Sequence, residues 1–248
     1  MITGHLVESK AWMKRHGKEA YQILEKMFTD CPQDHFFDHM LQFQFVGDVW
    51  KEGVLVGFSA VSWIDEPFLV EGVKCYVLIN GPTVLVPAGW GMRIFFKQLS
   101  LFLAERVTKV EENAKVFMVM LSEGIKSFLF LENNFDCYYP HWAYPTPRFE
   151  QAVLNEVGAF FGKSEWVPEK GIVLYEEGEG KLKPEINEMV MGSLLPAEEK
   201  IFQFFKSKNP GFLDGDYLVC IAPCDRNYFA KHLCILEGEK KVPWFSRL

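Results

Sequence analysis

One stretch of the chain, NGPTVLVPAGWGMRIFFKQLSLFLAERV at residues 80–107, restricts the possible folds more than any other. A β-branched run, TVLV, ends at Pro87, glycines follow at Gly89 and Gly91, and a long apolar-periodic segment begins at about Met92. Because proline and glycine interrupt regular structure, this pattern predicts a strand, a tight turn and a helix. Turns of this kind often hold a phosphate group at the N-terminus of the helix, although a plain helix start after a proline stop is an equal alternative.

Known phosphate-binding patterns are absent from the turn. The Walker sequence G-x-x-x-x-G-K-[ST] does not occur, and Ile94 stands where the third glycine of G-x-G-x-x-G is required. The turn therefore predicts a phosphate site only in combination with the elements around it.

Hydrophobic periodicity predicts those elements. Before the turn we expect helices at residues 9–28 and about 34–45 and then a meander of three strands, with turns at KEG and at Glu71-Gly72. After it, the unbroken apolar run KVFMVML predicts a buried central strand, GIKSFLFLENN a helix, and FDCYYPHW a strand that Pro140 closes. Beyond the proline-rich connector AYPTPRFEQ we expect helices at residues 150–161 and about 197–206, and strands at residues 172–175 and in DYLVCIAP.

The composition favours a thick core and disfavours nucleic acid as a partner. Apolar residues make up 49% of the chain and aromatic residues 15%, which fits a large core or a pocket for an apolar group. We expect about half of the aromatic residues around the presumed site to line such a pocket; these include Phe128, Phe130, Tyr138, Tyr139 and Trp142. The net charge of -7 argues against a nucleic-acid surface, which needs clustered lysine and arginine.

Targeting signals are not visible. No apolar run approaches the roughly 20 residues of a membrane-spanning helix, and the N-terminus lacks the apolar region of a signal peptide. The six cysteines are scattered, in a chain too long for a disulfide-stapled mini-fold. We therefore expect free thiols and a cytoplasmic protein.

The order of elements, with VLVP before the turn and FLENNFDCYY after the second helix, resembles the GCN5-related N-acetyltransferase (GNAT) superfamily. Three further segments, NGPTVLVPAGWG, MLSEGIKS and NPGFLDGDYLVC, resemble an uncharacterised bacterial family of GNAT-like proteins over about residues 12–232. The resemblance implies an α/β (α+β) fold with a mixed, mostly antiparallel sheet flanked by helices. It further implies a GNAT-like core at residues 1–145 and a C-terminal extension, residues 146–248, packed on the same body.

The same resemblance implies how an acyl-CoA would bind. The turn residues Gly89, Gly91 and Arg93 would hold the pyrophosphate, and the amides near Leu85 and Val86 would hold the thioester oxygen. The chain departs from the superfamily motif [QR]-x-x-G-x-[GA], because its positions are occupied by Trp90, Arg93 and Phe95; a bulky residue there would crowd a phosphate. The general-acid tyrosine of the superfamily would fall near Phe130, which has no hydroxyl group.

A polar island, LSEGIKS, follows the predicted central strand. Ser122 and Glu123 end the strand and Lys126 opens the next helix, at the end of a strand where α/β sites usually form. Glu123 or His141 is the candidate general base, and Ser122 and Lys126 are candidate cofactor-binding residues. The alternative for Ser122 is a simple helix cap.

Metal and covalent chemistry are less supported. His35 and His39 share a helical face, but no third ligand accompanies them, so we expect no metal. Cys137 and His141 would lie about 13 Å apart on one face of a strand, too far for direct contact.

Together these patterns predict an acyltransferase that moves an acyl group from acyl-CoA, or another acyl-thioester, to a small-molecule or peptide amine. Two alternatives remain open. One is a non-catalytic binding protein on a decayed GNAT scaffold, favoured by the degenerate turn. The other is a FemABX-like aminoacyl transferase, which the charge of -7 disfavours because it would bind a charged tRNA.

Overall fold

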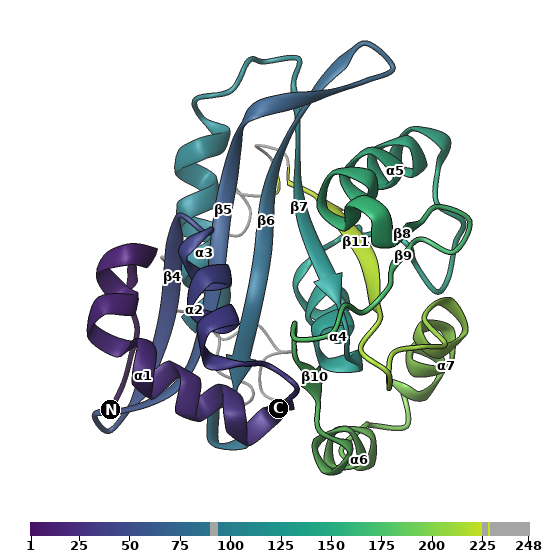
Figure 1. Ribbon diagram of the computed structural model, residues 1–248. Helices are drawn as coiled ribbons and strands as arrows, with labels where there is room; N and C mark the ends of the chain where they lie inside the picture. The colour runs from purple at the N-terminus through teal and green to yellow at the C-terminus, as the bar shows by residue number, and fades with distance from the viewer. Residues whose placement is uncertain (90–93, 225–227, 229–248) are drawn as a thin grey trace.

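The computed structural model describes residues 1–89, 94–224 and 228 of the 248-residue chain, and these form a mixed α/β body (Figure 1). The strands of its main sheet are β1 (Ile2–Thr3), β2 (Leu6–Glu8), β4 (Phe45–Lys51), β5 (Val54–Val70), β6 (Val73–Leu85), β7 (Lys115–Ser122), β8 (Trp166–Val167), β9 (Ile172–Val173) and β11 (Tyr217–Pro223). A small second sheet pairs β3 (Phe28–Thr29) with β10 (Lys181–Leu182). The helices are α1 (Ser9–Met27), α2 (Gln33–Leu41), α3 (Ile94–Val107), α4 (Ile125–Asn134), α5 (Arg148–Gly162), α6 (Pro184–Gly192) and α7 (Glu199–Lys208).

The main sheet is mostly antiparallel, which confirms the predicted fold class. Its strands follow the order β1-β4-β5-β6-β7-β11-β9-β8, and β2 also pairs with β4. One pair, β6 with β7, is parallel. A parallel pair needs a crossover connection, and α3 provides it, as the strand–turn–helix pattern predicts.

The meander of β4, β5 and β6 is fixed by two tight turns. Both central residues have positive φ in each: 53° and 81° at Glu52 and Gly53, and 46° and 81° at Glu71 and Gly72. Such two-residue turns match the twist of antiparallel strands, and glycine adopts positive φ without strain. Both turns lie where the sequence predicts them.

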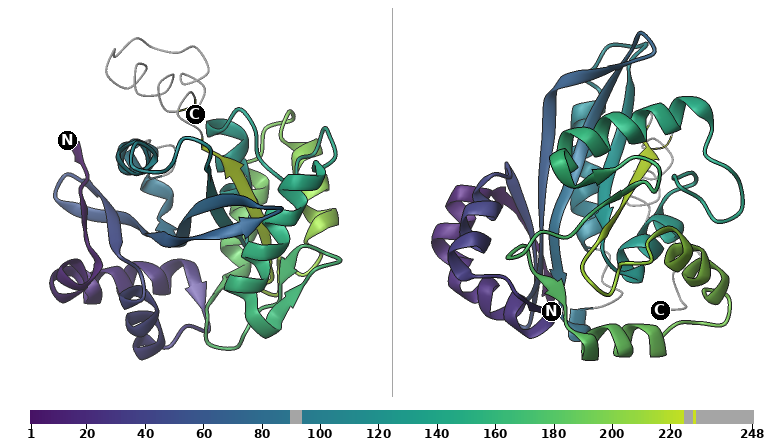
Figure 2. Two further views of the ribbon diagram at one scale, coloured as in Figure 1. Left: turned by 90° about the horizontal axis from the view of Figure 1, so that it is seen from above. Right: turned by 45° about the vertical axis from the view of Figure 1, so that its right-hand side comes forward.

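The helices cover both faces of the sheet (Figure 2). Phe58 of β5 packs against Trp12 of α1 and Phe36 of α2, with ring centroids 5.6 and 5.9 Å away. Phe45 of β4 packs on the other face against Phe102 of α3, at 5.2 Å. α5 covers the C-terminal half of the sheet, where Val153, Leu154 and Val157 join the core cluster of β6, β7 and β11.

The part of the chain after residue 145 contributes strands to the same sheet. β11 pairs antiparallel with β7 from Leu218 opposite Ser122 to Pro223 opposite Phe117. Its other edge pairs with β9. The buried run KVFMVML is therefore central because β6 and β11 both cover its edges.

Two sequence-based expectations were wrong. FDCYYPHW does not form a strand: its pairing with the sheet is a single bridge between Tyr139 and Ile221, and the bond from Tyr139 to Pro140 is cis. Pro140 has no N–H to extend a ladder. In addition, α6 was not expected, although Pro184 stands at its first position, where proline is well tolerated.

The aromatic residues expected to line an acyl pocket mostly belong to the core. Phe128 of α4 is fully buried, with ring centroids 5.5 Å from both Tyr138 and Phe205. Tyr138 is 1% exposed, and its hydroxyl group donates to Glu132 Oε2 at 2.6 Å. These rings join α4 to α7 and fill the space by themselves.

In the described part of the chain, no helix combines the length and apolar character that crossing a bilayer requires.

The role of Phe128 in the core can be tested with a matched substitution. Phe128→Ala should lower the free energy of unfolding by about 3–5 kcal/mol, because it leaves a cavity between α4 and α7. The control, Phe160→Ala, changes a ring that is 52% exposed on α5 and should cost about 1 kcal/mol or less. Urea unfolding measures both, and equal losses would contradict the packing described here.

Candidate functional site

The candidate site begins where β6 and β7 part. Their parallel pairing runs from Cys75 with Lys115 to Asn80 with Met120. Beyond that point β6 continues to Leu85 beside β5, whereas β7 continues to Ser122 beside β11. The two strands therefore diverge at the level of Asn80, and we call this point the branch.

Side-chain hydrogen bonds fix the branch. Asn80 is 8% exposed, and its Nδ2 donates to Ser59 Oγ at 3.1 Å and to Thr83 Oγ1 at 2.7 Å. The Ser59 and Thr83 hydroxyl groups also bond to each other at 2.7 Å. These contacts hold β6 on β5 past the irregularity in register between Ser59 and Val61.

Glu123 lies directly after β7, one residue beyond the branch-side end of that strand. Its Oε1 accepts a hydrogen bond from the backbone N–H of Leu182 at 2.6 Å. Burial raises the pKa of Glu123 from an ordinary 4.5 to about 8, against the opposing effect of this hydrogen bond. No hydrogen bond from the described residues reaches its other oxygen, Oε2.

Further acidic and phenolic groups surround Glu123. Tyr217 begins β11 and stands across from it, because the next residue, Leu218, pairs with Ser122. Burial raises the pKa of Tyr217 well above 10, and the charge of Glu123 adds to that rise. The charge of Glu179 raises the pKa of Tyr217 further. The pKa of Glu179 is itself raised, mainly through burial.

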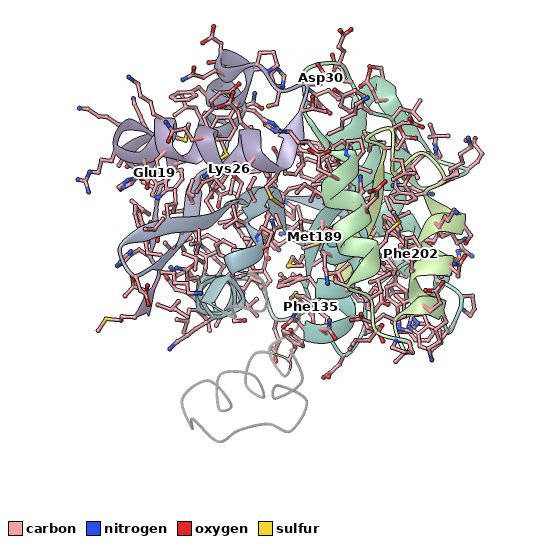
Figure 3. The ribbon with its side chains drawn as sticks, turned by 90° about the horizontal axis from the view of Figure 1, so that it is seen from below. Glu19, Lys26, Asp30, Phe135, Met189 and Phe202 are labelled. Atoms are coloured by element: carbon pink, nitrogen blue, oxygen red, sulfur yellow. The ribbon has the colours of Figure 1, made fainter. Side chains whose placement is uncertain are left out.

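The loop between α1 and α2 closes this site from the N-terminal half. Cys31 lies in that loop, and burial, followed by the charge of Asp30, raises its pKa to about 11. The Tyr175 hydroxyl donates to Asp30 Oδ2, which ties the end of α1 to the C-terminal half. Figure 3 labels Asp30 after the end of α1. Burial, followed by this hydrogen bond, raises the pKa of Tyr175 to about 12.

These raised pKa values share two causes: loss of water and mutual negative charge. Only the second favours a positive charge among the groups, because burial disfavours charge of either sign. Lys181 supplies one nearby, since its Nζ lies 5.7 Å from the centroid of the Tyr175 ring. The environment is suited to bind an ammonium group and to accept a proton from it.

Sequence reasoning identified Glu123 but missed its neighbours. Leu182 is 59 residues away, and it reaches Glu123 because β10 pairs with β3 at the end of α1. Lys183 N–H donates to Met27 O at 2.9 Å and strengthens the same connection. Neither segment, taken alone, contains a pattern that predicts this contact.

Ser122 and Lys126 occupy different places from Glu123. Ser122 is fully buried, and its Oγ has no hydrogen-bond partner among the described residues. Successive strand residues point to opposite faces, so Ser122 faces away from the side on which Glu123 lies. Lys126 is exposed in the first turn of α4. The structure thus does not gather the three polar residues of LSEGIKS into one cluster.

The turn after β6 contains two of the predicted cofactor-binding residues within the described chain. Gly89 is buried, and a Cβ there would lie 2.6 Å from Leu85 Cδ1, so a larger residue would have to displace the Leu85 side chain. Val86 N–H donates to Val56 O at 3.0 Å. The expectation that the Val86 amide holds a thioester oxygen is therefore wrong, because that amide belongs to the pairing with β5. Gly91 and Arg93 lie outside the described residues.

Leu85 and Phe95 are placed more favourably for a ligand. Strand amides alternate in direction, so the amide of Leu85 faces the side of β6 that β7 leaves, opposite to that of Val86. Phe95 at the start of α3 points toward β4, where a Cβ on Gly47 would lie 3.8 Å from Phe95 Cδ1. Its ring therefore does not occupy the turn.

His141 lies far from Glu123 and is held in a structural cluster. Tyr139 bridges Ile221, four residues along β11 from Tyr217, which corresponds to about 13 Å. His141 stacks on Tyr144 with centroids 3.8 Å apart, and its Nε2 lies 3.7 Å from Glu132 Oε2. Burial lowers the pKa of His141. Glu123 and His141, the two alternative candidates for the general base, therefore lie at separate places.

Glu132 organises that cluster. Its Oε2 accepts hydrogen bonds from the Tyr138 hydroxyl at 2.6 Å and from Trp142 Nε1 at 3.1 Å. The carboxylate thereby shapes the turn around Pro140 and places His141 beside it.

Among the described residues, no group of three or more histidine, cysteine, aspartate or glutamate side chains is arranged to hold a metal ion. His35 and His39 face each other with ring centroids 6.1 Å apart.

Comparisons with known proteins give a similarity to solved structures only. No family model matches the chain. No curated protein matches its sequence.

The solved structures that resemble the chain include several acetyltransferases, one of which is described as a GNAT family acetyltransferase. The aminoglycoside N-acetyltransferase AAC(6')-Iy in complex with CoA is 14% identical, with 53% of this chain and 85% of that one covered and a TM-score of 0.37. The ribosomal-protein-alanine N-acetyltransferase from Brucella melitensis biovar Abortus 2308 is 15% identical, with 60% and 100% covered and a TM-score of 0.39. A GNAT family acetyltransferase from Brucella melitensis in complex with acetyl-CoA is 19% identical, with 48% and 76% covered and a TM-score of 0.31. A likeness of this degree transfers neither a substrate nor the role of a residue to this chain.

The raised pKa of Glu123 makes a prediction about stability. In the folded protein Glu123 keeps its proton up to about pH 8, whereas the unfolded chain loses it near pH 4.5, so the folded state binds more protons in between. This contribution to stability is complete below pH 4.5 and is lost as the pH rises to about 8. Glu123→Gln keeps an acceptor for Leu182 and removes the titration. The variant should gain on the wild type by up to about 1.4 kcal/mol per pH unit across that window, as measured by urea unfolding.

The matched control is Glu188→Gln, which changes an exposed glutamate on α6. Its stability should follow the wild type at every pH. A constant difference between Glu123→Gln and the wild type from pH 5 to pH 8 would contradict the raised pKa.

Proposed function

We propose that the chain is an N-acyltransferase, which transfers an acyl group from an acyl-CoA thioester to an amine at the branch between β6 and β7. The observation that carries the proposal is the divergence of this one parallel pair beyond Asn80 and Met120, with the buried carboxyl group of Glu123 just beyond the end of β7. An extended thioester arm fits between two diverging strands, and the amine fits beside the carboxyl group. The resemblance of the sequence to GNAT proteins supports the same assignment.

The acceptor amine would enter as an ammonium ion. Negative charge near Glu123 would attract it and favour its protonated form, so a group that accepts its proton is needed before the nitrogen can attack. Glu123 in its ionised form takes that proton, and a pKa of about 8 suits a base that works near neutral pH. The neutral nitrogen then attacks the thioester carbon and the carbon–sulfur bond breaks. The second proton of the amine nitrogen passes to the departing thiolate, and Glu123 releases the first proton to solvent.

The carrier would lie along β6 and the turn. As the resemblance implies, the amide of Leu85 remains the proposed donor to the thioester oxygen as negative charge develops on it. Gly89 lets the turn pack closely over Leu85, and the N-terminus of α3 follows it. Gly91, Arg93 and Lys126 remain the proposed contacts to the carrier phosphates, and Ser122 a proposed contact on the opposite face.

The alternative is a non-catalytic binding protein on the same scaffold. The degenerate turn favours it, but the position of Phe95 against β4 removes the steric objection to a phosphate there. The two functions differ in what they require of Glu123, because acyl transfer by this route needs it as a base and binding alone does not.

The proposal predicts a pH-dependent reaction. With acetyl-CoA and a panel of diamines and amino-terminal peptides, the protein should release CoA thiol, which a thiol-reactive dye detects. The rate constant kcat/KM should rise with pH until about pH 8, as Glu123 loses its proton. Glu123→Gln should lower it by about a hundredfold or more, since it removes the base.

Glu188→Gln serves again as the control and should leave the rate unchanged. If acetyl-CoA binds but the whole panel gives no thiol release, the binding-protein alternative stands. If Glu123→Gln is as active as the wild type, the proposed base is wrong.

A further inference from the structure

A separate cavity of about 390 Å³ lies between the N-terminal residues, α1 and β4. Its walls include His5 from the N-terminal segment, Arg15 and His16 from α1, and Asp48 and Trp50 from β4. β5 separates β4 from β6, so the strand that carries Asp48 lies about 10 Å from β6, and the cavity is separate from the branch. Its size falls within the range of small-molecule sites, and nothing in the proposed transfer reaction uses it.

A buried carboxylate forms the base of this cavity. Asp48 is 3% exposed. Its Oδ2 accepts a hydrogen bond from Trp12 Nε1 at 2.9 Å, and its Oδ1 accepts one from the backbone N–H of His5 at 2.8 Å. Both donors are neutral. Among the described residues the one ion-pair contact of Asp48 is with His5 Nδ1, at 3.3 Å.

The N-terminal segment holds this carboxylate in place. β1 and β2 both pair with β4, and the interruption between them falls opposite Asp48. There the backbone N–H of Asp48 donates to His5 O at 2.9 Å, and the backbone N–H of His5 donates to the side-chain Oδ1 of Asp48. A buried charge without a lysine or arginine partner is costly, so a fold that fixes one in a cavity favours a cationic ligand.

The residues of the walls and the rim indicate which other chemical groups the ligand carries. His16 lies between two indoles, with ring centroids 5.8 Å from Trp12 and 5.1 Å from Trp50. Such rings accept apolar groups and also attract cations. Arg15 is exposed at the rim, and its guanidinium group is suited to pair with a carboxylate. An anion alone would meet the charge of Asp48, and a simple cation would leave Arg15 unused.

We propose that this cavity binds a free amino acid with an apolar side chain. Its ammonium group would contact Asp48, its carboxylate Arg15, and its side chain the rings of His16 and Trp50. The site is independent of acyl transfer and persists if the chain has no such activity.

Calorimetry on the full chain tests the ligand class. L-Phenylalanine and L-leucine should bind saturably in the absence of CoA. Phenethylamine lacks the carboxylate and 3-phenylpropionate lacks the amine, so each should bind at least about tenfold more weakly than L-phenylalanine. Absence of saturable binding at millimolar amino acid, or equal binding of either analogue, would overturn the proposal.

Two variants and one control test the residues. Asp48→Asn and Arg15→Gln should each weaken L-phenylalanine binding about tenfold or more. Lys14→Gln changes the exposed residue beside Arg15, which does not line the cavity, and should bind as the wild type does. Unchanged affinity in Arg15→Gln contradicts the proposed contact.

A second readout remains if Asp48→Asn fails to fold. The indole N–H of Trp12 bonds to Asp48, so its NMR resonance should shift when L-phenylalanine saturates the wild type. A resonance that stays unmoved at saturation would place the ligand elsewhere and reject the site.

Discussion

Backbone pairing at the centre of the sheet determines where chemistry can occur in this chain. β6 pairs with β7 up to Asn80, and the next residues are Gly81 and Pro82. Proline cannot donate to a ladder and occurs in sheets at edges and bulges, and here the register with β5 also shifts. Each strand then keeps one neighbour, β5 or β11, so the sheet opens at the branch while each strand remains paired on one side. At the branch, a backbone edge of β6 therefore lies near the end of the buried strand β7.

The electrostatic environment differs between the two buried carboxyl groups, Glu123 after β7 and Asp48 on β4. Glu123 receives one backbone hydrogen bond and has lost much of its water, so its neutral form is favoured at neutral pH. Asp48 is also buried but accepts hydrogen bonds from two neutral donors and contacts His5. The first environment suits a group that exchanges protons, and the second suits a fixed charge that binds a cation. The two buried carboxyl groups thus lie in different environments, which is the basis of the two proposals made for them.

The sequence predicted most of the helices and strands well, but it predicted poorly which distant segments come into contact. The helices α1, α3 and α5 and the strands β4 to β7 follow from periodicity, and the turns at Glu52-Gly53 and Glu71-Gly72 from local residue chemistry. FDCYYPHW has the composition of a strand, but neighbours decide pairing, and Pro140 has no N–H to extend a ladder. Glu123 was chosen as a candidate because polar residues after a buried run are conspicuous. Its contacts with Leu182 and Tyr217 were not predicted, because contacts across 59 and 94 residues leave no local pattern.

Hydrogen–deuterium exchange with and without a saturating acyl-CoA measures the central claim most directly, because it locates the carrier without assuming an acceptor. If the branch is the site, amides at residues 81–85 and 121–124 should gain protection together, while β1, β2 and the cavity at Asp48 stay unchanged. Protection confined to other segments, or none at saturation, would show that the divergence of β6 and β7 does not bind an acyl-CoA and would contradict the account.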